Sequence, residues 1–488
     1  PPPPPSPPPP PPPPPPSPSP LPSSPASPHP SPPPPRPPLP FHLAAAGYAQ
    51  LGQDIDGEAA DNYFGAAVAI SADGLVLAVG APRNRPGNDA TMMGHARVYA
   101  WDDNTWVQLG DDFDGVVKNE YLGHAVALND DGSIFAVVSE KSRFGSKRSG
   151  HVRVHMWDGA ANAWVRRGQD LEGEAHKDFI SSVALSADGS VVAWGAYAND
   201  GSGTDAGHAR IYAWDGANNE WVQRGQDVDG EAAGDRLGEF QVALSADGSV
   251  FAAGAHLNDD AGNNAGHVRV YAWDSVANEW VQRGQDLGGE AAGDQAGTSV
   301  ALSANGAIVA MGAKYNGDGG DYAGHVRVYT WDGTADAWVQ RGQDIDGEPA
   351  GGLAGSTMGL SANGDIVAVG AYYEPANHVR IYSWDGTTWQ PVGDILEGEA
   401  ENDQSSRGLA MSADGTIVAI GAPYNGDAGI SAGHTRVYAV YYHPSPPPSP
   451  MYPPRIPSDE PQVPPPPPAS PPPPPPPPPS PTPPPPSP

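Results

Sequence analysis

Short runs of alternating apolar and polar residues recur along the middle of the chain. In His267–Asp274 (HVRVYAWD) apolar residues alternate with arginine and aromatic residues, which is the period of a β-strand. Gln241–Ala246 and Ser249–Ala255 are shorter apolar runs that flank the turn signal Asp247-Gly248. Trp280–Asp286 supplies a fourth run after a polar loop. This part of the sequence predicts four short strands and no helix.

The same pattern repeats seven times. The phrase WVQRGQD and its variants mark the end of each unit, at spacings of about 58 residues. The copies begin at Tyr48, Trp106, Trp164, Trp221, Trp280, Trp338 and Trp389. A repeat of four short strands at this period is typical of a solenoid or a β-propeller.

The two ends of the repeated region favour a closed ring. The last unit runs through Thr435–Ala439 and then meets proline, so it lacks its own fourth strand. Tyr48–Asp54 is a fourth strand with no unit before it. A ring can use the displaced strand to close itself and cover the sheet edges. We predict an all-β fold: a seven-bladed β-propeller over residues 48–442, closed by the N-terminal strand.

Proline divides the chain into three regions. Residues 1–40 hold 28 of the 63 prolines and residues 444–488 hold 29. Proline lacks an amide donor, so neither tail can form helix or sheet. We predict two proline-rich tails, polyproline II or disordered, on either side of the propeller. The chain begins at Pro1, and no signal peptide is present in it.

Charge and composition exclude several functions. The net charge of −32 argues against nucleic acid as a partner, because phosphates are bound by lysine and arginine. The sequence has no cysteine, and no apolar stretch is long enough for a transmembrane segment. We find no catalytic motif, and nothing in the sequence requires a cofactor.

The units resemble FG-GAP repeats, which build the propeller of integrin α-subunits. Phe64-Gly65, Gly80–Pro82 and Gly94–Tyr99 (GHARVY) carry the resemblance, and Gly421–Pro423 with Gly433–Tyr438 repeats it. The resemblance implies an extracellular propeller. Its calcium loops do not carry over, because loops such as Ala187–Gly189 offer too few oxygen ligands.

The tails resemble extensins and other hydroxyproline-rich wall glycoproteins. Ser31–Pro35 is an SPPPP unit, and Ser470 and Ser480 interrupt long proline runs. The resemblance implies a location outside the cell, in the wall or matrix. A cytosolic use of the same helix, as a ligand for SH3 or WW domains, stays open.

Acidic loops are the first candidate site. In a propeller the loops between blades share one rim with the loops that join the second and third strands, and both classes are acidic here. We therefore expect one strongly negative rim, with calcium as a candidate ligand and Asn316–Asp321 (NGDGGD) as the best single loop. The candidate ligand residues are Asn316, Asp318, Asp321, Asp200, Asp205, Asp259 and Asp260. The alternative is that these residues only build turns.

Two units break the symmetry of the repeat and supply the second candidate site. The second unit carries a basic loop, which suits an anionic glycan, and the sixth nearly loses the same loop and leaves two tyrosines. The candidate ligand-binding residues are Lys141, Arg143, Lys147, Arg148, Tyr372 and Tyr373. Charge balance on the acidic rim and core packing are the alternatives.

The sequence thus favours an adhesion or structural interaction protein of the cell wall or matrix. We expect it to bind a glycan or a protein through the acidic rim. An enzyme acting on polysaccharide is the second interpretation, and an intracellular scaffold is the third.

Overall fold

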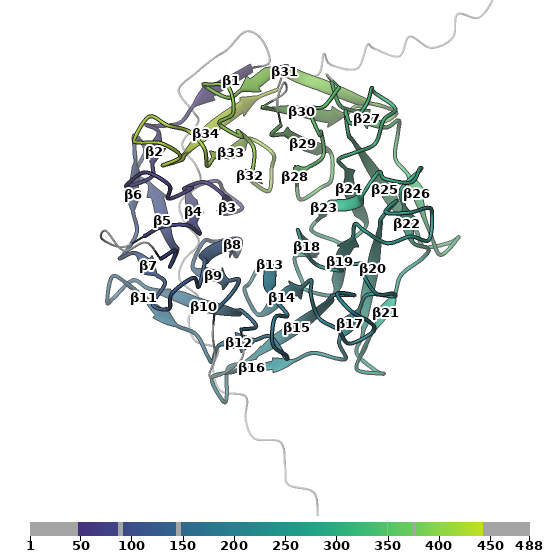
Figure 1. Cartoon of the computed structure of the whole chain (residues 1–488), viewed down its shortest axis with the longest axis horizontal. Coiled ribbons are helices and arrows are strands. Elements are labelled where there is room, and N and C mark those ends of the chain that lie inside the picture. The colour runs from purple at the N-terminus through teal and green to yellow at the C-terminus, as the bar shows by residue number, and fades with distance from the viewer. Residues whose placement is uncertain (1–46, 86–90, 143–147, 349, 374–376, 443–488) are drawn as a thin grey trace, which may run out of the picture. The chain divides into compact units, whose positions relative to one another are not determined.

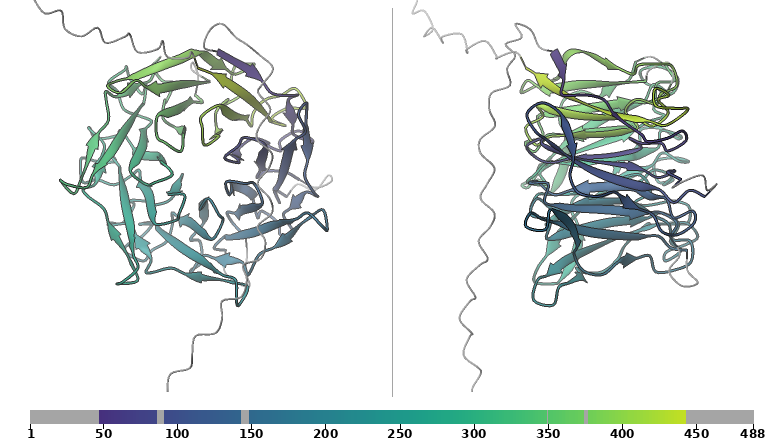
Figure 2. Two further views of the ribbon diagram at one scale, coloured as in Figure 1. Left: turned by 180° about the vertical axis from the view of Figure 1, so that it is seen from behind. Right: turned by 90° about the vertical axis from the view of Figure 1, so that its left-hand side faces the viewer.

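A computed structural model describes residues 47–85, 91–142, 148–348, 350–373 and 377–442. Within these ranges the secondary structure consists of strands alone, so no helix there could cross a membrane. The strands form seven separate sheets around a central channel, each with its first strand innermost (Figures 1 and 2). The predicted all-β, seven-bladed propeller is confirmed. Both proline-rich tails lie outside the described residues.

Blades 1 to 4 follow one another along the chain. Blade 1 contains β3 (Ala67–Ile70), β4 (Val76–Ala81), β5 (His95–Trp101), β6 (Trp106–Gln108) and β7 (Phe113–Asp114). Blade 2 contains β8 (Leu122–Leu128), β9 (Ile134–Ser139), β10 (His151–Asp158), β11 (Ala163–Arg166) and β12 (Leu171–Glu172). Blade 3 contains β13 (Ile180–Leu185), β14 (Val191–Ala196), β15 (His208–Asp215), β16 (Glu220–Gln223) and β17 (Val228–Asp229). Blade 4 contains β18 (Val242–Leu244), β19 (Val250–Ala255), β20 (His267–Asp274), β21 (Glu279–Gln282) and β22 (Leu287–Gly288).

Blades 5 to 7 complete the ring. Blade 5 contains β23 (Ala296–Leu302), β24 (Ile308–Ala313), β25 (His325–Asp332), β26 (Ala337–Gln340) and β27 (Ile345–Asp346). Blade 6 contains β28 (Thr357–Leu360), β29 (Ile366–Ala371), β30 (His378–Trp384) and β31 (Trp389–Glu397). Blade 7 contains β32 (Gly408–Met411), β33 (Ile417–Ala422), β34 (His434–Tyr441), β1 (Gly47–Gln50) and β2 (Ile55–Asp56).

The ring closes as the sequence predicts. Strand β1 pairs antiparallel with β34, with Tyr48 opposite Val440 and Gln50 opposite Tyr438. The amide of Leu51 then donates to the carbonyl of Val437 at 2.7 Å. Figure 1 shows the purple N-terminal strand beside the yellow C-terminal one. The first and last parts of the propeller therefore share one sheet, in which β1 covers the outer edge of the third strand β34.

The outer edge of six of the seven blades differs from the prediction of four strands. In six blades the fourth strand is split into two pieces that pair with the same third strand, as β21 and β22 pair with β20. Gly284 interrupts the outer strand of blade 4 with a φ of +77°. A Cβ there would lie 2.7 Å from the ring of Trp331 in blade 5. The break in the strand thus makes room for the next blade's tryptophan.

Tryptophan pairs join neighbouring blades. Trp273 and Trp280 lie directly opposite each other on β20 and β21, with ring centroids 5.3 Å apart. The indole Nε1 of Trp280 donates to the carbonyl of Arg224 in blade 3 at 2.8 Å. The Arg224 guanidinium lies over the ring of Trp273 at 4.6 Å. The same indole bond to the preceding blade recurs at Trp106, Trp164, Trp221, Trp338 and Trp389.

The loops between blades and the loops between second and third strands lie on one rim, as predicted. Their backbones hydrogen-bond to each other, as in Arg236 to Asp205 and Leu353 to Tyr322, both at 3.2 Å. We call the segment that enters a blade its linker. This rim is also where every first strand begins and every second strand ends, so it frames one mouth of the channel.

Candidate functional site

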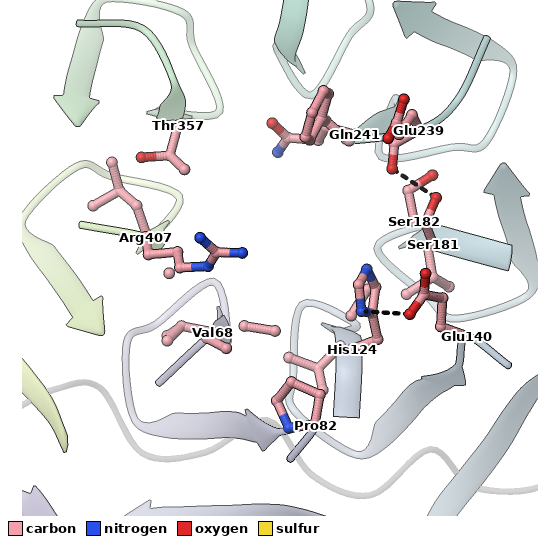
Figure 3. A pocket seen from close by; sticks show the side chains of 18 of the residues that line it. Val68, Pro82, His124, Glu140, Ser181, Ser182, Glu239, Gln241, Thr357 and Arg407 are labelled. Atoms are coloured by element: carbon pink, nitrogen blue, oxygen red, sulfur yellow. Dashed lines mark hydrogen bonds and ion pairs between the residues drawn. The ribbon is translucent and has the colours of Figure 1, made fainter. Parts of the chain in front are cut away.

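A pocket of about 480 Å³ occupies the channel mouth at this rim (Figure 3). Its walls are the starts of the first strands and the ends of the second strands, and all seven blades contribute. Residues at these places lie beyond the buried sheet core, so the repeat can keep its fold while their chemistry varies. A pocket of this volume fits a small ligand of one or two sugar units.

Two sets of residues, with one residue from each blade, carry most of the variation. In each blade the last residue of the second strand pairs with the histidine that opens the third strand, as Ala255 pairs with His267. The first set consists of the residue that follows this pair along the second strand's chain direction. Around the ring this position holds Pro82, Glu140, Tyr197, His256, Lys314, Tyr372 and Pro423. The second set lies where the chain enters the first strand of each blade and consists of Ala66, His124, Ser181, Glu239, Thr298, Ser356 and Arg407. We call these the second-strand ring and the first-strand ring.

Glu140 is the centre of one polar cluster. Its carboxylate lies 3.1 Å from Lys141 Nζ and 3.5 Å from His124 Nδ1. The hydroxyl of Tyr197 in blade 3 donates to it at 3.4 Å. Burial lowers the pKa of His124, although the charge of Glu140 acts in the opposite direction. The His124 side chain is 35% exposed, so a ligand in the pocket can reach it. Burial likewise raises the pKa of Tyr197, so the phenol stays a donor.

Glu239 is the centre of the second cluster. Its carboxylate lies 3.6 Å from His256 Nε2 and 3.5 Å from an Arg236 nitrogen. Burial raises the pKa of Glu239, and the nearby charge of Glu140 adds to that effect. Burial with the charge of Lys314 lowers the pKa of His256 to about 3. The imidazole is therefore neutral at physiological pH and can both donate and accept.

The pocket has a different charge balance from the chain as a whole. Three cationic side chains and two anionic ones line it, although the net charge of the protein is −32. Arg407 lies 5.8 Å from the ring centre of Tyr372, and Arg83 lies 4.3 Å from that of Tyr63. The pocket therefore carries cations from single blades beside its carboxylates, and the strongly negative charge of the surrounding loops stays a prediction.

The predicted ligand-binding residues divide into three groups. Lys141 and Tyr372, from blades 2 and 6, both line the pocket. Arg148 and Tyr373 do not line it: the backbone amide of Arg148 donates to His176, and Tyr373 is half exposed beside Tyr372. Arg143 and Lys147 lie outside the described residues.

The predicted metal residues lie in three separate loops, one each in blades 3, 4 and 5. Asn316 is buried, donating to the Asp294 carboxylate at 3.2 Å and accepting from the amide of Asp318 at 2.9 Å. Asp200 and Asp259 accept amide hydrogen bonds within their own loops. The loop side chains named here thus take part in turns, and the candidate role in calcium binding stays a prediction.

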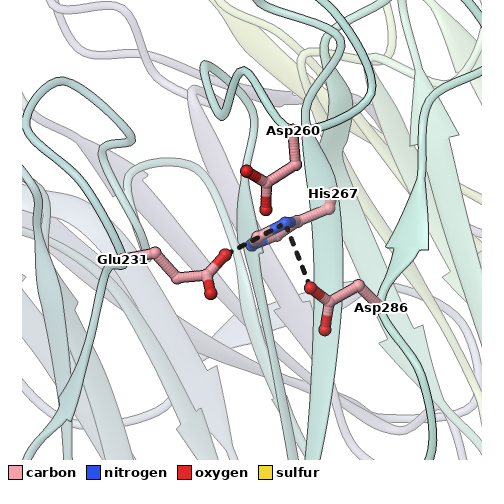
Figure 4. A group of neighbouring side chains, drawn as sticks. All are labelled: Glu231, Asp260, His267 and Asp286. Atoms are coloured by element: carbon pink, nitrogen blue, oxygen red, sulfur yellow. Dashed lines mark ion pairs between the residues drawn. The ribbon is translucent and has the colours of Figure 1, made fainter.

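Other acidic groups do gather on this rim. Five clusters place a third-strand histidine with two or three carboxylates, their ligand atoms within 4.8 Å of one another. Figure 4 shows the cluster in blade 4, where Glu231, Asp260 and Asp286 surround His267. Asp260 is the one predicted metal residue that belongs to such a cluster among the described residues.

An arginine already binds these carboxylates. Arg269 donates to Asp286 at 2.8 and 2.9 Å, and it also pairs with Glu231. Although burial alone would raise it, these hydrogen bonds hold the pKa of Asp286 below its usual value. Arg97, Arg210, Arg327 and Arg436 contact the carboxylates of the other four clusters. The guanidinium supplies the positive charge that a metal ion would otherwise bring.

The sequence prediction missed most of the pocket. The lining residues His124, Glu140, Glu239 and Arg407 did not stand out, because each lies in a stretch that otherwise matches its neighbours. The same holds for Tyr197 and His256, which contact Glu140 and Glu239. A signal was available in the repeat: the Gly-Ala that ends most second strands is followed by proline, tyrosine, histidine or lysine, depending on the blade. A position that varies within a constant frame marks a surface that is not needed for folding.

Comparisons with known proteins add little to this geometry. No protein-family model matches the sequence, and no curated protein matches it significantly. Similar solved structures include hydrazine synthase of Kuenenia stuttgartiensis, at 14% identity and a TM-score of 0.47, covering 76% of this chain and 94% of that one.

Two further similar structures are described as lactonases. The periplasmic gluconolactonase of Pseudomonas aeruginosa has 17% identity and a TM-score of 0.45, covering 68% of this chain and 84% of that one. A Bacteroides uniformis protein described as a 6-phosphogluconolactonase has 12% identity and a TM-score of 0.47, covering 68% and 86%. Likenesses this distant carry no inference about the chemistry of this chain.

Proposed function

We propose that this protein is a glycan-binding propeller and that the channel-mouth pocket is its binding site. The observation that carries the proposal is the convergence of chemically different side chains from seven similar blades on one pocket. Neutral histidine, tyrosine and carboxylates are suitable partners for sugar hydroxyls, and aromatic rings such as Tyr372 pack against sugar rings.

A place in the cell wall or matrix is part of the same proposal. It depends on the likeness of residues 1–40 and 444–488 to extensins and of the repeats to FG-GAP units. Hydroxyproline analysis of the protein from its native source tests it. Unmodified proline in both tails would contradict the extracellular location and favour an intracellular scaffold.

Binding is tested with an oligosaccharide array followed by calorimetry on the full chain. We expect His124→Ala to weaken binding by roughly tenfold, because a hydrogen bond to sugar is lost. The matched control is Asp321→Asn, on an exposed loop of blade 5, which should change the affinity less than twofold. Binding that depends on Asp321 and not on His124 would contradict the pocket as the site.

An enzyme acting on polysaccharide is the second candidate. Two carboxylates in one pocket favour it, because burial raises the pKa of Glu239 while Glu140 is held by Lys141 and His124. A carboxyl group with a raised pKa suits the acid of glycoside hydrolysis, which also needs a second carboxylate in the same site. A reducing-end assay with the array's best ligand decides: turnover that Glu239→Gln abolishes supports the enzyme, and binding without turnover supports the first proposal.

A further inference from the structure

We propose that the pocket selects sugars that carry an acidic group, and that Arg407 binds this group. The inference rests on the proposed glycan-binding function and adds the class of ligand and its orientation. The shared chemistry is an oxyanion on a sugar ring, either the carboxylate of a uronic acid or a sulfate ester.

Arg407 belongs to the first-strand ring and comes from blade 7. It directly precedes β32, and its guanidinium points into the cavity (Figure 3). Its Nη1 donates to the side-chain oxygen of Gln404 at 3.2 Å, and its guanidinium lies 5.8 Å from the ring centre of Tyr372. Among the described residues no carboxylate lies within ion-pair distance of Arg407.

The arginines that repeat in the third strands differ from Arg407, because they are paired with carboxylates. Arg210, Arg269 and Arg327 are each largely buried between two carboxylates, one from their own blade and one from the linker that enters it. The paired carboxylates neutralise the positive charge of these guanidinium groups, which is therefore not available to a ligand. Arg407 is exposed in the pocket and keeps its charge and most of its five donors available. A planar guanidinium suits bidentate binding of an oxyanion.

The opposite wall favours hydroxyls over a second anion. Glu140 and Glu239 come from blades 2 and 4, and both are already paired with cations of their own. Their remaining oxygen lone pairs can accept hydrogen bonds from sugar hydroxyls. Because these two carboxylates are paired, this wall offers hydrogen-bond acceptors and no site for a second anion, so the geometry points to a sugar with one acidic group directed at blade 7.

Calorimetry on the full chain tests this orientation with three probes. They are a galactose trimer in which one unit is galacturonic acid, the methyl ester of that trimer, and a neutral galactose trimer carrying one sulfate. We expect the acid trimer to bind better than the ester, and Arg407→Gln to weaken only the charged ligands, by roughly tenfold or more. Arg407→Lys should fall between, because it keeps the charge and loses the planar fork.

The matched control is Arg85→Gln, which removes a rim arginine that pairs with Asp61 and does not line the pocket. It should leave all three affinities within twofold. An effect of Arg407→Gln on the sulfated trimer alone would assign the anion to sulfate, and an effect on the uronate alone would assign it to carboxylate.

Two results would overturn the inference. If acid and ester bind equally, and Arg407→Gln does not distinguish them, the pocket binds glycans without selecting an acidic group. If none of the three trimers binds and the array shows no other glycan ligand, the proposed function fails and this inference fails with it. Melting curves of Arg407→Gln and Arg407→Lys establish that each variant is folded.

Discussion

Single side chains in this protein play one of two roles, set by their place in the blade. The histidine that opens each third strand repeats in all seven blades and is almost fully buried in most of them. His325 accepts a hydrogen bond from Arg327 at 3.3 Å, which requires the neutral imidazole. His256 occurs in one blade only and contacts the pocket residue Glu239. Burial lowers the pKa of both His325 and His256. Protonation at low pH is therefore unfavourable in the blades and beside the pocket alike.

Stability should fall as the pH drops below about 6.5. The pKa of His256 is about 3 in the folded protein and 6.5 when unperturbed, so the unfolded chain binds more protons between these values. We expect His256→Gln to reduce the stability difference between pH 7.5 and pH 5 by about 1–2 kcal/mol. Urea unfolding at both pH values measures this. His176→Gln, at an exposed histidine, is the control, and an unchanged pH dependence in His256→Gln would contradict the prediction.

At the scale of elements, the linkers and the second-to-third-strand loops stabilise each other. Asp294 ends the turn of the linker that enters blade 5 by accepting from the amides of Glu290 and Ala291 at 3.0 and 2.9 Å. Asn316, from the loop of the same blade, donates to the same carboxylate. Asn258 with Asp235 and Asn425 with Asp403 repeat this bond in blades 4 and 7. These bonds fix the rim on which the pocket opens.

Asn316→Ala should destabilise the protein by about 1–3 kcal/mol, because it leaves a buried carboxylate with one partner fewer. Urea unfolding measures the loss, and Asp321→Ala in the exposed part of the same loop should change little. We expect the same loss with calcium and with EDTA. A loss that appears only when calcium is present would instead favour the calcium interpretation of this loop.

At the scale of the whole molecule, closure depends on one short strand. Strand β1 contributes four residue pairs to β34 in blade 7, and the hydroxyl of Tyr48 donates to the carbonyl of Val392 in blade 6. Leu51 and Ile55, which follow it, belong to the apolar cluster shared by blades 1 and 7. The N-terminal segment therefore contacts three blades, and the pocket depends on all of them keeping their places.

Removing residues 1–50 should lower the melting temperature by roughly 5 °C or more, because the edge of β34 and its apolar neighbours become exposed. Removing residues 1–46 keeps β1 and should leave the melting temperature nearly unchanged. Calorimetric melting of the two truncated chains makes the comparison. Equal melting temperatures would show that closure by β1 does not stabilise the ring.

The repeat alone determined the fold. Strand periodicity and glycine turns predict the strands of each blade. The surplus strand at Tyr48 and the missing fourth strand after Ala439 predict that the ring closes through these two segments. These signals are local or are repeated seven times, so they can be read without coordinates. The sequence also pointed to two of the pocket residues, Lys141 and Tyr372, because their loops depart visibly from the repeat.

Only the tertiary structure decided where the site is. Glu140 and Glu239 are 99 positions apart, and neither belongs to a recognisable motif. They meet because the ring brings the same end of every blade to one channel mouth, a long-range consequence of closure. The acidic loops drew attention in the sequence, but packing pairs many of their carboxylates with arginines and backbone amides. Charge that is conspicuous in a sequence is often neutralised in the fold, whereas an unpaired group such as Arg407 is identified only from its surroundings.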